Sequence, residues 1–155
     1  MTDEQSFSTV AADLMRAVDA ALPKLRAISE RDAGQPRTAD VPDKWSPKHV
    51  IGHLIDSAAN NHQRFVRAQQ GPLTFPPYAQ NHWVDCQRYQ DRPWTDLIAF
   101  WVAYNRHLAH VIRQIPDDRQ CVSCTVESNE PVTLGFLASD YVVHLRHHLA
   151  QVGAD

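Results

Sequence analysis

Four segments of the chain place apolar side chains three or four residues apart, which is the spacing of an amphipathic helix. They span residues 7–28, 47–70, 94–115 and 133–152. Each segment has to bury its apolar side against another one, and nothing in the pattern indicates a large sheet. The spacing therefore predicts an all-α four-helix bundle.

Residues at the segment ends support these boundaries. Ser46-Pro47 can cap and begin the second helix, and Trp94-Thr95 offers similar chemistry at the third. Gly153 is a suitable stop for the last helix. Pro23 falls inside the first segment, where its missing N–H should kink the helix or divide it near Ala20.

The connections differ in length and character. Residues 31–44 are expected to form a loop. Residues 71–91, rich in proline and aromatic side chains, should form a long irregular connection over one end of the molecule, either as a functional lid or as a packed surface loop. Residues 116–133 favour a small hairpin or an extended loop before the last helix.

The length and the net charge of the chain indicate the number of domains and exclude some classes of partner. A chain of 155 residues suits one domain, residues 1–155. The net charge of -3, from 15 basic and 18 acidic residues without long blocks, argues against a nucleic-acid partner or an anionic membrane surface. Residues 1–10 do not resemble a secretory signal, and no apolar run is long enough to cross a bilayer.

The cysteine content favours a reducing environment, so we expect a cytoplasmic protein. The chain has 3 cysteines, an odd and small number that does not suit a disulfide framework. Cys121 and Cys124 form a CxxC pair, but no second Cys or His pair follows at the spacing of a zinc finger. We therefore assign this pair no function.

Histidine is the unusual residue, with 9 in the chain. His144 and His148 are one helical turn apart on the inward flank of the last helix, so both imidazoles can reach one metal ion, whereas His147 points outward. A firm site needs a third ligand from another helix. The candidates are His49, His53, His62, His107 and His110, and helical geometry does not decide among them, although His110 points away from its apolar stripe.

Three groups of residues occur in a characteristic order along nearly the whole chain. They are Trp45-Ser46-Pro47, then His53-Leu54-Ile55-Asp56-Ser57 with Asn60-Asn61, and finally Tyr141-x2-His144-x2-His147-His148-x2-Gln151. This arrangement resembles the DinB/YfiT superfamily. The resemblance implies a four-helix bundle in which one histidine of the second helix and the HxxxH pair of the last helix hold a divalent metal. On this sequence the ligands become His53, His144 and His148.

The resemblance also limits the function. Some members of the superfamily transfer low-molecular-weight thiols to electrophiles, some isomerise maleylpyruvate with a thiol cofactor, and many are described only as metal-dependent hydrolases. We therefore expect a dimeric thiol transferase or hydrolase that acts on a small molecule and binds zinc, nickel or iron, with a low-molecular-weight thiol as a further cofactor. The alternative is a non-catalytic, metal-binding or stress-associated dimer.

His53 lies on a polar stripe of the second helix, which would place the metal in an accessible cleft between helices. Asp56 and Asn60 on this stripe could orient a ligand imidazole or bind the substrate, and Arg64 could hold a carboxylate. His49 on the same stripe is the substitute if His53 is not a ligand, and a solvated helix face is the simpler alternative. Three neutral ligands would leave a position at which a water or a thiol is activated, and no other catalytic residue is predicted.

Overall fold

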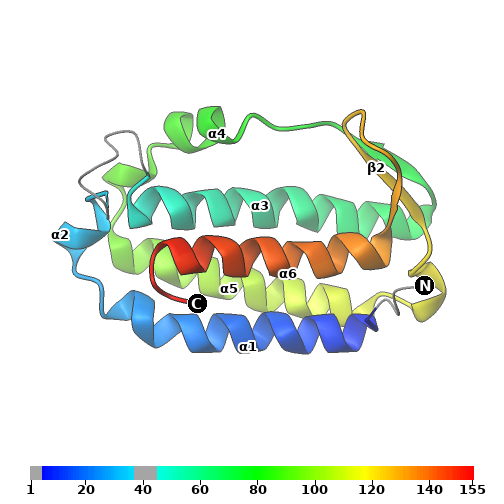
Figure 1. Cartoon of the computed structure of the whole chain (residues 1–155), viewed down its shortest axis with the longest axis horizontal. Coiled ribbons are helices and arrows are strands. Elements are labelled where there is room, and N and C mark those ends of the chain that lie inside the picture. The colour runs from blue at the N-terminus through cyan, green and yellow to red at the C-terminus, as the bar shows by residue number, and fades with distance from the viewer. Residues whose placement is uncertain (1–4, 37–44) are drawn as a thin grey trace.

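The structure is a computed structural model that describes residues 5–36 and 45–155. Four long helices form the body of the molecule (Figure 1). They are α1 (Phe7–Arg26), α3 (Pro47–Arg67), α5 (Trp94–Gln114) and α6 (Leu134–Gln151). The predicted all-α four-helix bundle is confirmed. The predicted loop over residues 31–44 lies outside the described residues from residue 37 onward.

The helices do not simply alternate in direction. In Figure 1, α3 and α5 run from the end near α2 (Glu30–Ala33) toward the end with the strands, and α1 and α6 run the other way. α3 packs against both α5 and α6, and α1 packs against the same two helices. The α3–α5 and α3–α6 contacts therefore lie on two different sides of α3.

The connection between α3 and α5 has to return along the bundle because these two helices are parallel. It contains η1 (Ala68–Gln70), β1 (Leu73–Phe75), α4 (Gln80–Gln87) and η2 (Tyr89–Asp91). Figure 1 shows it running along the length of α3, onto which α4 and η2 pack. The prediction of an irregular cover over one end of the molecule was wrong, since this connection is a partly helical layer over one side.

A small sheet closes one end of the bundle. After η3 (Asp117–Arg119), strands β2 (Ser123–Val126) and β3 (Val132–Thr133) pair in antiparallel fashion. This hairpin was one of the two predicted arrangements. β1 adds to β2 in parallel with Leu73 opposite Cys124, which was not predicted. The sheet ties the start of the long connection to the segment that leads into α6.

The predicted signals at two helix ends are confirmed. The Ser46 side chain accepts from the His49 N–H at the start of α3, and the His49 ring accepts in return from the Ser46 N–H. Gly153, with φ +68°, stops α6. There the Ala154 N–H donates to the Leu149 carbonyl, which is the pattern of a Schellman cap.

Two expectations about helix ends were wrong. Thr95 does not cap α5; the Trp94 N–H donates instead to the Glu30 carboxylate, 2.8 Å away on α2. Pro23 does not divide α1, which continues to Arg26. Pro23 has no N–H to donate to the carbonyl of Asp19, four residues earlier. Because Pro23 lies in the last turn of α1 and Asp19 is exposed, this carbonyl faces water.

The core lies between the four long helices. Its largest fully buried side chains include Trp101, Phe7, Phe65, Leu14 and Leu145. Val66 on α3 is an exception among its apolar residues, with 47% of its surface exposed. Within the part of the chain that the structure describes, no helix combines the length and the apolar content needed to cross a membrane.

Candidate metal centre

Three imidazoles meet between α3 and α6. His53 comes from α3, and His144 and His148 come from successive turns of α6. The His144 Nε2 atom lies 3.3 Å from the His53 Nε2 atom and 3.1 Å from the His148 Nε2 atom. Nitrogen ligands at Zn–N bond lengths of about 2.0–2.1 Å are about 3.3–3.4 Å apart around a tetrahedral ion. The three side chains can therefore hold one metal ion.

Two of the three rings are oriented through their other nitrogen. The His148 Nδ1–H donates to the Gln151 side-chain oxygen at 2.8 Å. The His144 Nδ1 atom lies 3.5 Å from the Ser57 hydroxyl, which is a longer and weaker contact. A partner at Nδ1 fixes the tautomer of the ring and directs its Nε2 lone pair toward the position between the three rings where an ion would lie.

His53 is the buried member of the triad, with 1% of its surface exposed. Its ring lies against Trp45, with 5.1 Å between centroids, and its Nδ1 atom has no hydrogen-bond partner among the described residues. Burial, followed by the nearby His148 and His144, lowers the pKa of His53 to about 3.

The other two rings are also favoured in the neutral form. Burial and the neighbouring His148 and His147 lower the pKa of His144 to about 4. The pKa of His148 is lowered as well, mainly by burial, although its bond to Gln151 acts in the opposite direction. All three imidazoles are therefore neutral at pH 7, which is the state that binds a metal.

The central residues of the polar stripe on α3 are buried. The alternative interpretation, that the stripe is a solvent-exposed helix face, was therefore wrong for these residues. His53, Asp56 and Ser57 of the stripe have exposed fractions of 1%, 2% and 3%, and the neighbouring Asn61 has 9%. They lie on the sides of α3 that α4, η2 and α6 cover. His144 and His148 are only half-buried, so the open side of the triad faces away from the α3 layer.

Asp56 is held by the long connection. Its Oδ1 atom accepts from the Tyr89 hydroxyl at 2.6 Å and from the Gln87 amide at 2.7 Å. Its Oδ2 atom is buried without a partner in the described part of the chain, and burial raises the pKa of this carboxyl group. Gly52 lets the Tyr89 ring approach, because a Cβ atom there would lie 2.2 Å from it.

Asn60 and Arg64 lie farther along α3. The Asn60 amide donates to the Asp56 backbone carbonyl at 2.9 Å, and the Arg64 guanidinium donates to the Asn61 side chain at 3.4 Å. Arg64 is 11 positions after His53, which corresponds to about 16 Å along a helix. Its charge is therefore too far from the triad to act there directly, and could only meet a distant part of a bound molecule.

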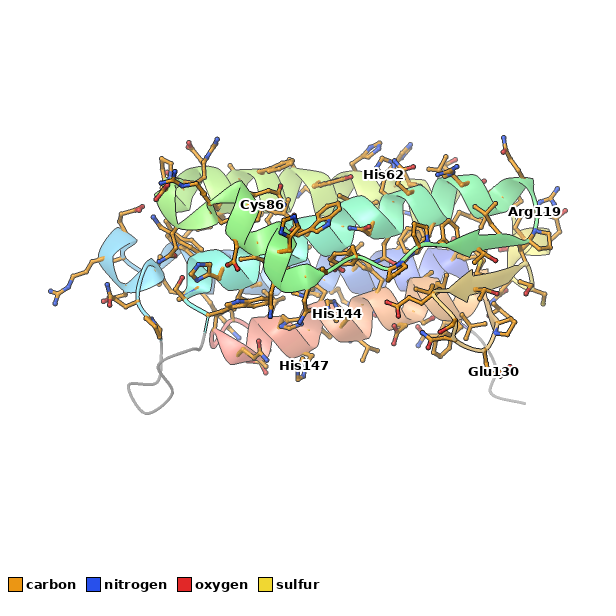
Figure 2. The ribbon with its side chains drawn as sticks, turned by 90° about the horizontal axis from the view of Figure 1, so that it is seen from above. His62, Cys86, Arg119, Glu130, His144 and His147 are labelled. Carbon is orange, nitrogen blue, oxygen red and sulfur yellow. The ribbon has the colours of Figure 1, made fainter. Side chains whose placement is uncertain are left out.

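The other candidate histidines are not members of the triad. His49 belongs to the α3 cap, and His147 points away from α3 in Figure 2. His62, His107 and His110 lie on α3 and α5 and are not part of the three-histidine group. Cys121 and Cys124 are both free thiols.

Several residues that shape the site had no assigned role in the sequence interpretation. They are Trp45, Ser57, Gln87, Tyr89 and Gln151. The spacing of His148 and Gln151 on one helix face was a usable signal for their contact. Gln87 and Tyr89 gave no such signal, because their contacts depend on how the connection folds back.

Comparisons with known proteins agree with this architecture. A family model described as the DinB superfamily matches residues 14–152. No curated protein sequence matches the chain. The solved structures that share the fold include YfiT from Bacillus subtilis, described as "a probable metal-dependent hydrolase with an unusual four-helix bundle topology". It is 18% identical with a TM-score of 0.83, over 98% of this chain and 86% of YfiT.

A second such structure is the mycothiol-dependent maleylpyruvate isomerase. It is 14% identical with a TM-score of 0.77, and the match covers 97% of this chain. This chain spans 62% of the length of the isomerase.

Proposed function

The chain belongs to the DinB superfamily, and we propose that it is a metal-dependent enzyme in which His53, His144 and His148 hold one divalent ion. The enzyme activates a thiol or a water molecule toward a small-molecule substrate. The observation that supports this function best is the convergence of the three Nε2 atoms at the spacing of metal ligands. Three neutral protein ligands are typical of catalytic sites, which keep one coordination position open.

The ion, which we propose to be zinc, nickel or iron, would lower the pKa of a bound water to about 7 and deprotonate a bound thiol outright. Gln151 and Ser57 keep two of the imidazoles turned toward the ion. Trp45 and the Tyr89–Asp56 pair close the His53 side to water. Substrate would therefore approach from the side of the half-buried His144 and His148.

We favour thiol transfer over hydrolysis. Water attack is often assisted by a carboxylate base, whereas a thiol that is already deprotonated needs none. Among the described residues, the side chains that hydrogen-bond to the triad imidazoles or stack on their rings are Trp45, Ser57, His147 and Gln151, none of which carries a carboxylate. The nearby Asp56 uses its Oδ1 atom to accept hydrogen bonds from Tyr89 and Gln87.

Arg64 supports a ligand that extends beyond the triad. Burial lowers the pKa of its guanidinium, and Tyr78, Cys124, Glu127 and Asp140 lie close enough to favour its charge. Its recorded hydrogen bond is to a neutral amide. We propose that Arg64, with Asn60 beside it, binds an anionic group of the thiol or of the substrate about 16 Å along α3 from His53.

Metal content tests the ligand assignment. Protein purified without an affinity tag or chelator, and dialysed to remove weakly held ions, should retain about one metal per chain by elemental analysis. The double variant His144→Ala, His148→Ala should lose this metal. His147→Ala, on the same helix but facing outward, should keep it. Retention of the metal by the double variant, with its helical circular dichroism intact, would contradict the assignment.

Activity tests the reaction. Metal-loaded protein is incubated with a chlorinated aromatic electrophile and a panel of cellular thiols, and the thioether adduct is measured by mass spectrometry. A parallel panel of esters and amides tests hydrolysis. Metal-dependent adduct formation supports thiol transfer, and turnover of esters or amides alone supports the hydrolase. Bound metal without turnover in either panel supports the alternative, a non-catalytic metal-binding protein.

We also propose that the chain acts as a homodimer, as the family resemblance implies. Exposed apolar side chains that a second copy could cover include Phe100, Phe136 and Val143, with exposed fractions of 53%, 48% and 64%. Sedimentation equilibrium should give about twice the chain mass of 17.6 kDa. A single species at the mass of one chain would contradict the dimer.

A further inference from the structure

A second pair of histidines lies on the other side of α3. His62 of α3 and His107 of α5 approach each other with 5.2 Å between ring centroids and an interplanar angle of 79°. Figure 2 places His62 on the α5 side of α3, opposite His144 on the α6 side. The pair is therefore separate from the metal centre described above.

The triad provides a direct comparison for this geometry. Its three ring pairs have centroid separations of 5.2, 4.6 and 4.5 Å, each with an interplanar angle of 73°. The His53–His144 pair, at the same 5.2 Å as His62–His107, has its Nε2 atoms 3.3 Å apart. The rings of the second pair therefore lie as close together as those of one triad pair, and rotation of the exposed His107 ring can bring one nitrogen of each ring to a shared ion.

One ring of the second pair also has a partner that fixes its orientation. The His62 Nδ1 atom lies 3.2 Å from the Tyr104 hydroxyl, and the His62 Nε2 atom is free to bind a metal when Nδ1–H is the donor of this bond. Phe100 stacks on the Tyr104 ring with 5.8 Å between centroids. Burial, followed by the nearby His107, lowers the pKa of His62 and keeps its ring neutral at pH 7. A neutral, oriented imidazole is the form that ligates a metal.

We propose that His62 and His107 form a second binding site for a divalent transition-metal ion that prefers imidazole ligands, such as zinc, nickel or copper. The site is weaker than the triad because the protein supplies two ligands instead of three, and water fills the other positions. His107 is exposed, so ions reach the site from solvent. His110, whose ring lies farther from that of His107, 6.4 Å away at an angle of 27°, is not included in the site.

Zinc stoichiometry tests the proposal. Isothermal titration with zinc is done on a Cys86→Ser, Cys121→Ser background, because these exposed thiols would also bind zinc. We expect two zinc ions per chain, one of them bound more weakly. His107→Ala should abolish binding of the weaker zinc ion. His110→Ala is the matched control on the same helix and should still bind both zinc ions. His107 and His110 are both exposed, so neither change should disturb folding.

The two sites can be tested separately. In the His144→Ala, His148→Ala variant we expect one weak zinc equivalent that His107→Ala then abolishes, and this result does not depend on the proposed enzyme activity. Nitrogen-15 NMR of the histidine rings should show zinc-dependent shifts at His62 and His107. A zinc stoichiometry that His107→Ala leaves unchanged would overturn the second site, as would loss of the weaker ion in His110→Ala.

Discussion

Each triad histidine is neutral because charging it would place a cation in a buried position next to two other imidazoles. The neutral state of these histidines makes the folded protein less stable as pH falls. As pH falls below 6.5, histidines in the unfolded chain take up protons, whereas His53 and His144 in the folded protein resist protonation down to about pH 3 and 4. The stability from these residues is complete above pH 6.5 and is lost as pH falls toward these values.

We expect metal-free protein to be less stable at pH 5 than at pH 7, as measured by urea unfolding. The slope is at most about 1.4 kcal/mol per pH unit for His53 and smaller for the half-buried His144. Asp56, whose pKa is raised mainly by burial, acts in the opposite direction and reduces the net slope. His144→Asn should have a shallower slope; an unchanged slope contradicts the assignment of the effect to the triad.

Gln151 stands outside the triad but holds one of its rings. Replacing it with Ala removes the acceptor of the His148 Nδ1–H, and we expect metal affinity to fall by about 10- to 100-fold. Competition with a chromogenic chelator measures the change. His147→Ala is the control, because His147 contacts the Gln151 amide group but is not among the three clustered ligands. Equal affinity in Gln151→Ala and the parent protein would remove Gln151 from the site.

At the scale of elements, one close approach helps to fix the long connection to α3. The Tyr89 ring of η2 lies where a side chain at residue 52 would be, and its hydroxyl reaches Asp56 one helical turn later. The glycine thus permits both the packing of η2 and the closed side of the metal centre.

Gly52→Ala should destabilise the protein by roughly 1–3 kcal/mol, because the added methyl group overlaps the Tyr89 ring and the helix backbone cannot move away. Urea unfolding measures the loss. Gly34→Ala is the matched control, since its nearest atoms, at 3.6 Å or more, are at ordinary contact distance. If the two variants were equally stable, Tyr89 would have to be less tightly packed than the structure shows.

At the scale of the whole molecule, the triad joins parts of the chain that are far apart in sequence. His53 and His144 are 91 residues apart, and they meet because α6 packs antiparallel to α3. A bound ion would therefore cross-link two of the four long helices and stabilise only the folded chain.

Chelation should lower thermal stability. At a free metal concentration 100 times the dissociation constant, binding adds about 2.7 kcal/mol, or about 5–10 °C in melting temperature for a domain of this size. Differential scanning fluorimetry with and without a chelator measures the shift, and returning the metal should restore it. The His144→Ala, His148→Ala variant should respond much less, because only the weaker second site remains. A chelator shift in this variant equal to that of the parent would assign the stabilisation to another site.

The sequence by itself determined the features that depend on residues close together in the chain. The four helices, the Ser46 cap, the Gly153 stop and the shared face of His144 and His148 follow from spacing along one helix or from a few residues at its end. The family resemblance added His53 as the third member, and the structure places it beside the other two. That these residues bind a metal remains a prediction.

Only the tertiary structure decided which surfaces meet. Helical periodicity describes a side chain relative to its own helix axis, so it could not show that η2 and α4 bury the polar stripe of α3, or that Glu30 completes the start of α5. For the same reason it left His62 and His107 as unplaced candidates. The parallel direction of α3 and α5 brings that pair together on the side of α3 opposite the triad.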